Sequence, residues 1–91
     1  MRISKPAAAG SLESSDALVT IAPHDGGIAL EVESVVLKQF GAEIERAVRE
    51  ALDALHVTSA RVHIKDRGAV ECVLKARVEA AVKRAGEVGA P

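Results

Sequence analysis

The stretch of sequence that decides the fold runs from Ile28 to Leu55 and reads IALEVESVVLKQFGAEIERAVREALDAL. Its beginning alternates apolar residues with alanine and glutamate, which is typical of a strand with one buried face. After Ser34 the apolar residues recur every three or four positions, which is the spacing of an amphipathic helix. We therefore predict a strand before Ser34 and a helix over residues 35–55, with Ser34 as its N-cap. The apolar face of this helix consists of Val36, Phe40, Ile44, Ala47, Val48, Ala51, Leu52 and Leu55.

Upstream lies a β-rich run, Ala-Leu-Val-Thr-Ile, at residues 17–21. Apolar residues occur on both of its sides, which predicts a strand inside the sheet. Residues 23–27 (Pro-His-Asp-Gly-Gly) read as a hairpin loop to the next strand, because Asp-Gly tolerates positive φ. Residues 1–13 are expected to be extended and loosely held, since Pro6 and Gly10 break helices and the alanines between them offer little to bury.

Downstream, alternation at residues 61–65 predicts a third short strand, and Asp66 begins a turn. Helical spacing then predicts a second amphipathic helix over residues 68–85, with Asp66 available to cap it and Gly86 as a C-terminal stop. The residues predicted to form the core between helices and sheet are Val48, Leu52, Val73, Leu74 and Val78.

The resulting order is β-β-α-β-α, which predicts an α+β two-layer sandwich, a small sheet with two helices on one face. The connection through the first helix is expected to be right-handed. We divide the chain into a flexible N-terminal segment (1–15), a single α+β domain (16–86) and a frayed tail (87–91).

The composition argues against nucleic acids and membranes as partners. Acidic and basic residues are interspersed, the net charge is −1, and the chain has neither Trp nor Tyr to stack on bases. No apolar run approaches the roughly 20 residues of a membrane-spanning helix. The single cysteine, Cys72, cannot form an internal disulfide, which favours a cytoplasmic location. We expect Cys72 to pack as a small buried hydrophobe.

The sequence lacks the motifs of a self-contained active site, including a glycine-rich phosphate loop, a Gly-x-Ser-x-Gly elbow and Cys-x-x-Cys. The histidines His24, His56 and His63 share no local metal-ligand spacing. We therefore predict neither catalytic nor metal-binding residues.

One polar cluster, Ser-Leu-Glu-Ser-Ser-Asp at residues 11–16, allows two interpretations. It can be a simple turn before a strand, with local side-chain hydrogen bonds. It can also present an exposed hydroxyl for a tethered group, at a place that a modifying enzyme can reach.

The sequence resembles the acyl carrier proteins of citrate lyase, the gamma subunits of that complex. The matching motifs are AGSLESSD at residues 9–16, KQFG at 38–41 and DRGAVECVLKARVEAA at 66–81. Such proteins differ from ordinary acyl carrier proteins, which resemble acidic four-helix bundles.

The resemblance implies a covalent cofactor, 2′-(5″-phosphoribosyl)-3′-dephospho-coenzyme A, joined by a phosphodiester to the serine after Leu-Glu, which is Ser14 here. Ser15 and Ser11 are the competing acceptors in this sequence. The thiol of the arm would carry acetyl and citryl groups while citrate is cleaved to acetate and oxaloacetate. Glu13 and Asp16 would help the modifying transferase to recognise the site, through their negative charge.

The implied partners are the citrate lyase alpha subunit (a CoA-transferase), the beta subunit (a citryl lyase) and the prosthetic-group transferase. On this interpretation the chain itself is a non-catalytic carrier subunit, and its segment 1–15 bears the modification site. Two alternatives stay open: the carrier subunit of malonate decarboxylase, and a small α+β binding module without a cofactor.

Overall fold

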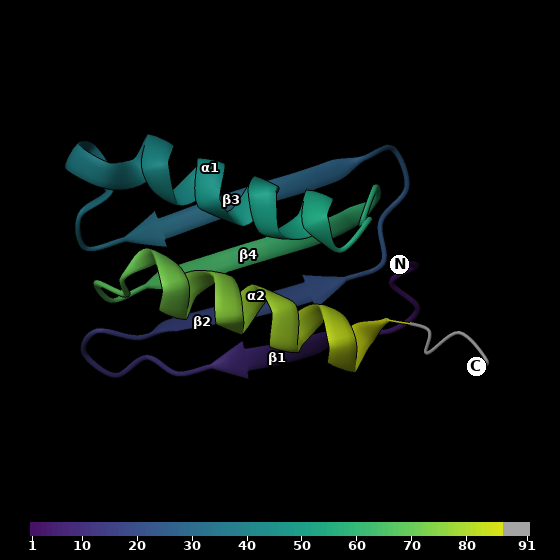
Figure 1. Cartoon of the computed structure of the whole chain (residues 1–91), viewed down its shortest axis with the longest axis horizontal. Coiled ribbons are helices and arrows are strands. Elements are labelled where there is room, and N and C mark those ends of the chain that lie inside the picture. Colours follow the sequence, from purple (N-terminus) through teal and green to yellow (C-terminus); the bar gives the residue numbers. More distant parts are fainter. Residues whose placement is uncertain (87–91) are drawn as a thin grey trace.

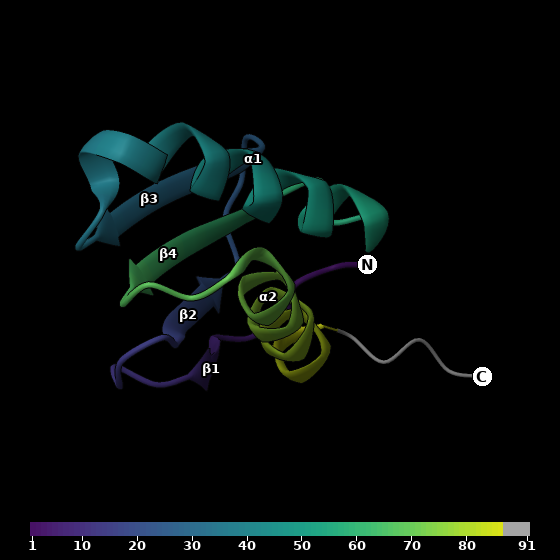
Figure 2. The same cartoon turned by 60° about the vertical axis from the view of Figure 1, so that its left-hand side comes forward.

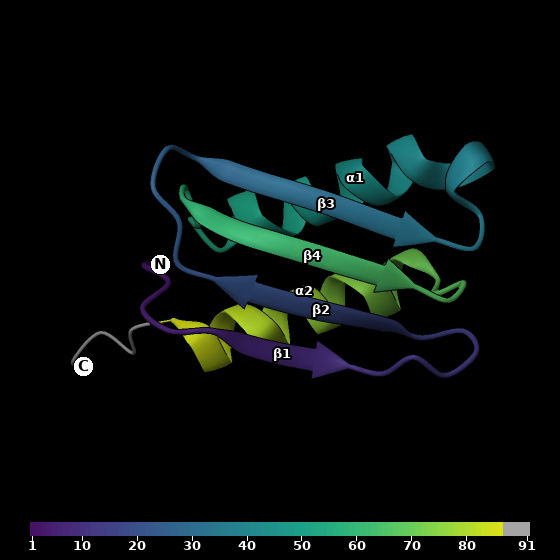
Figure 3. The same ribbon diagram turned by 180° about the vertical axis from the view of Figure 1, so that it is seen from behind.

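The computed structural model describes residues 1–86, which form a four-stranded sheet covered on one face by two helices (Figure 1). The strands are β1 (Ala7–Gly10), β2 (Ala17–Ala22), β3 (Ile28–Ser34) and β4 (Ala60–Asp66), and the helices are α1 (Leu37–Ala54) and α2 (Glu71–Ala85). Within residues 1–86, no helix lies on the other face of the sheet (Figure 3). The predicted two-layer α+β class, with both helices on one face, is confirmed.

The predicted element order was incomplete, because β1 lies in the segment expected to be loosely held. The order is β-β-β-α-β-α, and β1 pairs antiparallel with β2. An Ala-Ala-Ala-Gly strand has weak β propensity and is formed through tertiary contacts. Ala9 is buried, β1 lies beside α2 (Figure 2), and Arg84 of α2 donates a hydrogen bond to the Ala8 carbonyl (2.8 Å). The flexibility of residues 1–15 stays a prediction.

The internal position of β2 was predicted correctly, although for a different reason. The sheet order is β1-β2-β4-β3, so β2 has a neighbour on each side. Its side chains are not buried on both faces: Ala17, Val19 and Ile21 are buried, whereas Thr20 on the opposite face is exposed. β2 is internal because β1, which was not predicted, pairs with its outer edge.

The segment at residues 23–27 is not a hairpin loop, because β2 and β3 are not neighbours. β4 lies between them, antiparallel to β2 and parallel to β3. The connection from β3 through α1 to β4 is also left-handed rather than right-handed (Figure 1). With α1 on this face, a right-handed connection would have put β4 on the outer side of β3, away from β2.

Both helices begin later than predicted. α1 starts at Leu37 and Ser34 is not its N-cap: the Ser34 hydroxyl accepts the Val36 N–H (3.1 Å) and donates to Asp66 (2.7 Å). α2 starts at Glu71, since the residues after Asp66 form a loop bound to the carboxylate of Asp66.

The core lies between the helices and the inner face of the sheet. Of the five predicted core residues, Val48, Leu52, Leu74 and Val78 are at most 2% exposed, whereas Val73 is only half-buried. Phe40, which the helical pattern placed on the apolar face of α1, is 44% exposed. The predicted tail at 87–91 lies outside the described residues.

Candidate functional site

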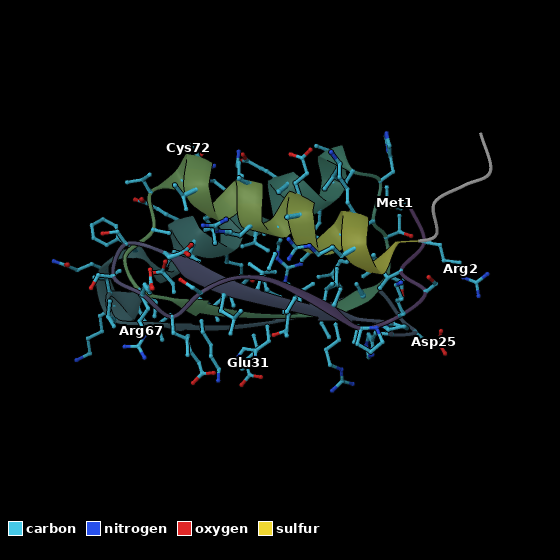
Figure 4. All side chains as sticks on the ribbon, turned by 90° about the horizontal axis from the view of Figure 1, so that it is seen from below. Met1, Arg2, Asp25, Glu31, Arg67 and Cys72 are labelled. Carbon is cyan, nitrogen blue, oxygen red and sulfur yellow. The ribbon has the colours of Figure 1, made fainter. Side chains whose placement is uncertain are left out.

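Three connections gather at one end of the molecule, and we call this the loop end. They are the β1–β2 loop at residues 11–16, the β3–α1 connection at 35–36 and the β4–α2 loop at 67–70. Met1 and the β2–β3 loop lie at the opposite end, as the labelled positions of Met1, Asp25 and Arg67 show (Figure 4). The candidate acceptor Ser14 therefore lies away from the start of the chain.

Ser14 occupies the tip of a turn whose base is tied to the β4–α2 loop. The Asp16 N–H donates to the Glu13 carbonyl (3.2 Å) and closes the turn. The Ser15 N–H donates to the Arg67 carbonyl, and the Arg67 N–H donates to the Asp16 carbonyl, each at 2.9 Å. Ser14 itself is exposed. The backbone around it is thus fixed while its hydroxyl faces solvent.

Asp16 anchors this turn to α2. Its carboxylate accepts hydrogen bonds from Arg77 Nε (2.8 Å) and Nη2 (3.2 Å), from the Ser11 hydroxyl (2.7 Å) and from the Ala17 N–H (2.8 Å). The Arg77 guanidinium, followed by the Ser11 hydroxyl and the Ala17 N–H, holds the pKa of Asp16 well below its usual range. Asp16 also raises the pKa of Arg77. Its charge is therefore already paired within the chain, which leaves Glu13 as the exposed acidic neighbour of Ser14.

Asp66 links the other two connections of the loop end, as Asp16 links its turn to α2. Its carboxylate is 3% exposed and accepts the Ser34 hydroxyl (2.7 Å) and the N–H groups of Gly68 (3.1 Å) and Ala69 (3.0 Å). The sequence indicated a capping role for Asp66. That prediction is wrong, because the N-cap of α2 is Val70 and no side chain caps this helix. Asp66 instead binds the loop before α2 and the β3–α1 connection, and no local signal pointed to Ser34.

The three serines of the loop differ in their surroundings. Ser11 is half-buried, and its hydroxyl both donates to Asp16 and accepts the Glu13 N–H (3.2 Å). Ser14 and Ser15 are both exposed, and their hydroxyls take no part in the hydrogen bonds that hold the turn. Ser15 has a left-handed backbone (φ 65°). A modifying enzyme would thus meet the hydroxyls of Ser14 and Ser15 before that of Ser11.

The remaining chemically reactive side chains are the histidines and Cys72. His63 pairs with Glu33, and a ring nitrogen of His24 lies 3.5 Å from Arg61 Nη2. Within residues 1–86, no cluster of three or more His, Cys, Asp or Glu could hold a metal ion. Cys72 is exposed, contrary to the prediction of burial, because its position at the start of α2 faces away from the sheet. Over the same residues no helix is long and apolar enough to cross a bilayer.

Exposed large apolar side chains surround the loop end, a feature that sequence reasoning missed. Five of the six such residues described belong to its connections or to the first turn of α1: Leu12 (47% exposed), Val35 (65%), Leu37 (48%), Phe40 (44%) and Val70 (62%). We call them the apolar ring. The helical pattern put Phe40 on a buried face, yet Phe40 lies in the first turn of α1 and is exposed. Val70 lies in the loop just before α2.

A sequence model of the family described as "Malonate decarboxylase delta subunit (MdcD)" matches residues 4–85. Among curated proteins, the citrate lyase acyl carrier protein of Escherichia fergusonii is 59% identical over 88 residues, 96% of this chain and 91% of that protein. The citrate lyase acyl carrier protein 2 of Salmonella typhimurium is 54% identical with the same coverage. The citrate lyase acyl carrier protein of Vibrio cholerae is 53% identical over 89 residues, which are 97% of this chain and 91% of that protein.

Among solved structures, a chain of a Pseudomonas malonate decarboxylase hetero-tetramer in complex with malonate matches with a TM-score of 0.75 and 22% identity. The match covers 94% of this chain and 93% of that one. At this identity the likeness establishes a shared fold.

Proposed function

We infer the function from one premise: the chain belongs to the family of citrate lyase acyl carrier proteins. It is an acyl carrier, and we propose that Ser14 is the residue to which its prosthetic group is joined. The observation that carries this proposal is the exposed Ser14 hydroxyl at the tip of a turn fixed by Asp16 and Arg67.

The residues present fit a covalently attached group of the proposed kind, 2′-(5″-phosphoribosyl)-3′-dephospho-coenzyme A. A phosphodiester at Ser14 would lie outside the core, beside the exposed acidic side chain of Glu13 and clear of the Asp16–Arg77 pair. When bound, the group supplies a thiol that carries the acyl group. The chain itself contributes a fixed base. Arg67 and Arg77 bind the residues after Ser14, and the Ser11 hydroxyl binds Glu13 and Asp16 across the turn.

The proposed partners are the citrate lyase alpha and beta subunits and the transferase that attaches the group. A carrier needs no catalytic pocket of its own, since a tethered group is presented to partner sites at high effective concentration. The loop end, with Ser14 and the apolar ring, is the surface that these partners would approach. Rings of exposed apolar side chains of this kind commonly mark protein–protein contacts.

The intact mass of the protein isolated from its native host tests the proposal. We expect a mass increase that corresponds to the phosphoribosyl-dephospho-coenzyme A group, and peptide mapping that assigns it to Ser14. An unmodified protein from that host, grown on citrate, would contradict the carrier function proposed for Ser14. Protein from a host that lacks the transferase serves as the unmodified reference.

The carrier subunit of malonate decarboxylase is the second candidate, because the matching family model and the matching structure both bear that name. The identities of 53–59% with citrate lyase carriers favour citrate lyase. Reconstitution of the loaded protein with the subunits of each complex decides between them: we expect turnover of citrate and none of malonate.

A further inference from the structure

A cleft of about 300 Å³ opens at the loop end, between the first turns of α1 and α2. Val36, Phe40 and Ile44 contribute its wall on the α1 side, and Leu74 contributes the wall on the α2 side. Gly68 and Ala69 of the β4–α2 loop also line it. This volume is at the lower limit of clefts that bind small molecules, which lie at about 300–1,000 Å³.

The turn that carries Ser14 is hydrogen-bonded to the β4–α2 loop, which lines the cleft. The Ser15 N–H binds the Arg67 carbonyl, and Gly68, the next residue along the chain, already lines the cleft. The buried carboxylate of Asp66 holds Gly68 and Ala69 in place. Among the described residues, nothing lies within 4 Å of the position that a Cβ on Gly68 would take, so this part of the loop is open. A group tethered to Ser14 therefore starts at the loop end, on a turn bound to the loop that lines the cleft.

The charge of the residues that line the cleft determines which part of a prosthetic group on Ser14 can bind there. Glu43, Asp66 and Glu71 are among the lining residues, and the described part of the chain contributes no lysine or arginine to the lining. Glu71 is ion-paired with Arg46 (2.6 Å) and Lys75 (3.3 Å). The like charge that an anionic phosphate would meet comes from Glu43 and Asp66. An uncharged chain of methylenes and amides, by contrast, can pack against Phe40 and Leu74.

We propose that this cleft holds the uncharged thiol end of the prosthetic arm while the carrier is free of its partners. The inference rests on the proposed attachment at Ser14. Binding in the cleft can be weak, because the tether supplies an effective concentration in the millimolar range. The arm then alternates between a sheltered position against Phe40 and an extended one that reaches a partner.

Thiol reactivity of the loaded protein tests this proposal. All variants carry Cys72→Ser, so that the exposed cysteine does not react, and the intact mass confirms the arm on Ser14. We expect a small aromatic disulfide reagent to react with the arm about two- to tenfold more slowly than with free pantetheine. Phe40→Ala should bring the rate to that of pantetheine. Leu37→Ala is the matched control, since Leu37 is similarly exposed on the same helix but does not line the cleft.

Amide NMR spectra of the loaded and unloaded protein provide a second readout. We expect the resonances of Gly68 and Ala69 to shift on loading, and Phe40→Ala to reduce the shift. A thiol that reacts as fast as pantetheine, or equal acceleration by Phe40→Ala and Leu37→Ala, would overturn the proposal while leaving attachment at Ser14 intact. An arm absent from Ser14 would instead refute the proposed function, and this inference with it.

Discussion

At the scale of single residues, the charge of Asp16 near the proposed acceptor stabilises the fold, because it forms an ion pair with Arg77. The position of Asp16 beside Ser15 suggested that the modifying transferase recognises its charge. In the structure, Arg77, 61 residues later, donates hydrogen bonds to both of its carboxylate oxygens. Long-range pairs of this kind leave no local pattern in a sequence. The exposed hydroxyl of Ser14 was within reach of sequence reasoning, but the hydrogen-bonded turn that carries it was not, because residues 1–15 were expected to be flexible.

Replacing Ser14 with Ala should give a folded protein that no longer accepts the prosthetic group. Ser14 is exposed and outside the core, so we expect the free energy of unfolding to change by less than about 0.5 kcal/mol. Exposure to the native modifying enzymes, followed by peptide mass mapping, measures labelling. Ser15→Ala and Ser11→Ala are the matched controls. The assignment fails if Ser14→Ala still gains the arm, or if folded Ser15→Ala alone abolishes labelling.

Replacing Asp16 with Asn should destabilise the protein at neutral pH, with an effect that shrinks in acid. Because folding lowers the pKa of Asp16, its stabilisation is complete above the unfolded pKa of about 3.9 and is lost as the pH falls through the lower folded value. Folding also lowers the pKa values of Glu50 and Glu71, but these residues are the same in both proteins. Their effects on stability therefore cancel when the two proteins are compared at each pH.

Denaturant unfolding of parent and Asp16→Asn proteins, in steps from about pH 7 to pH 2, measures this difference. We expect the gap between the two midpoints to be constant above about pH 5 and to narrow below about pH 4. A gap that stays the same down to the lowest pH would show that the Asp16–Arg77 pair does not stabilise the fold.

At the scale of elements, each helix contributes five buried residues to the core, but the first turn of α1 contributes none. α1 buries Ile44, Ala47, Val48, Ala51 and Leu52, which is the periodic face that the sequence predicted from residue 44 onward. Its first turn extends beyond the sheet edge, so Leu37 and Phe40 stay exposed although they continue the pattern. Periodicity indicates which face is apolar, but the length of the opposing strands determines how much of that face is covered.

Truncation of single helix residues should separate buried from half-buried positions. Leu52 and Leu74 are at most 2% exposed, so we expect Leu52→Ala and Leu74→Ala each to lower the free energy of unfolding by about 2–5 kcal/mol. Val73→Ala, next to Leu74 but half in solvent, should cost about 1 kcal/mol or less. Denaturant midpoints measure all three. A Val73→Ala variant as unstable as Leu74→Ala would contradict this packing.

The strands illustrate which parts of the fold were predictable. β2, β3 and β4 contain β-branched residues in alternation, and each was found near its predicted position. β1 consists of three alanines and a glycine, and it exists because α2 and β2 surround it. The order of the strands depends on which edge each one pairs with. That choice is made by tertiary packing, so neither the insertion of β4 nor the left-handed connection could be predicted from local patterns.

At the scale of the whole molecule, the two ends are chemically different. The loop end contains Ser14, the apolar ring and the cleft. The opposite end contains Met1, whose amino group donates to the carbonyls of Leu55 (3.2 Å) and His56 (2.6 Å), and the β2–β3 loop with Asp25 (Figure 4). If the carrier delivers its arm from the loop end, partners must contact this end and can leave the other in solvent.

Peptide insertions at the two ends test this polarity. A short Gly–Ser peptide between Asp25 and Gly26 should leave modification and acyl transfer unchanged, because Gly26 lies in open space at the end away from Ser14. The same peptide between Ala69 and Val70 should reduce acyl transfer in the reconstituted complex by more than tenfold, because it would obstruct the loop end. Surface loops tolerate such insertions thermodynamically, so both proteins should fold.

Circular dichroism and thermal melting of the two insertion variants establish folding before activity is compared. Intact mass then reports arm attachment, and reconstitution with the partner subunits reports acyl transfer, so that the two steps are scored separately. Equal activity of two folded, loaded variants would show that partners do not approach over the β4–α2 loop. Loss of activity only in the variant at Asp25 would place the contact at the opposite end, and the arm would then have to reach around the sheet edge from Ser14.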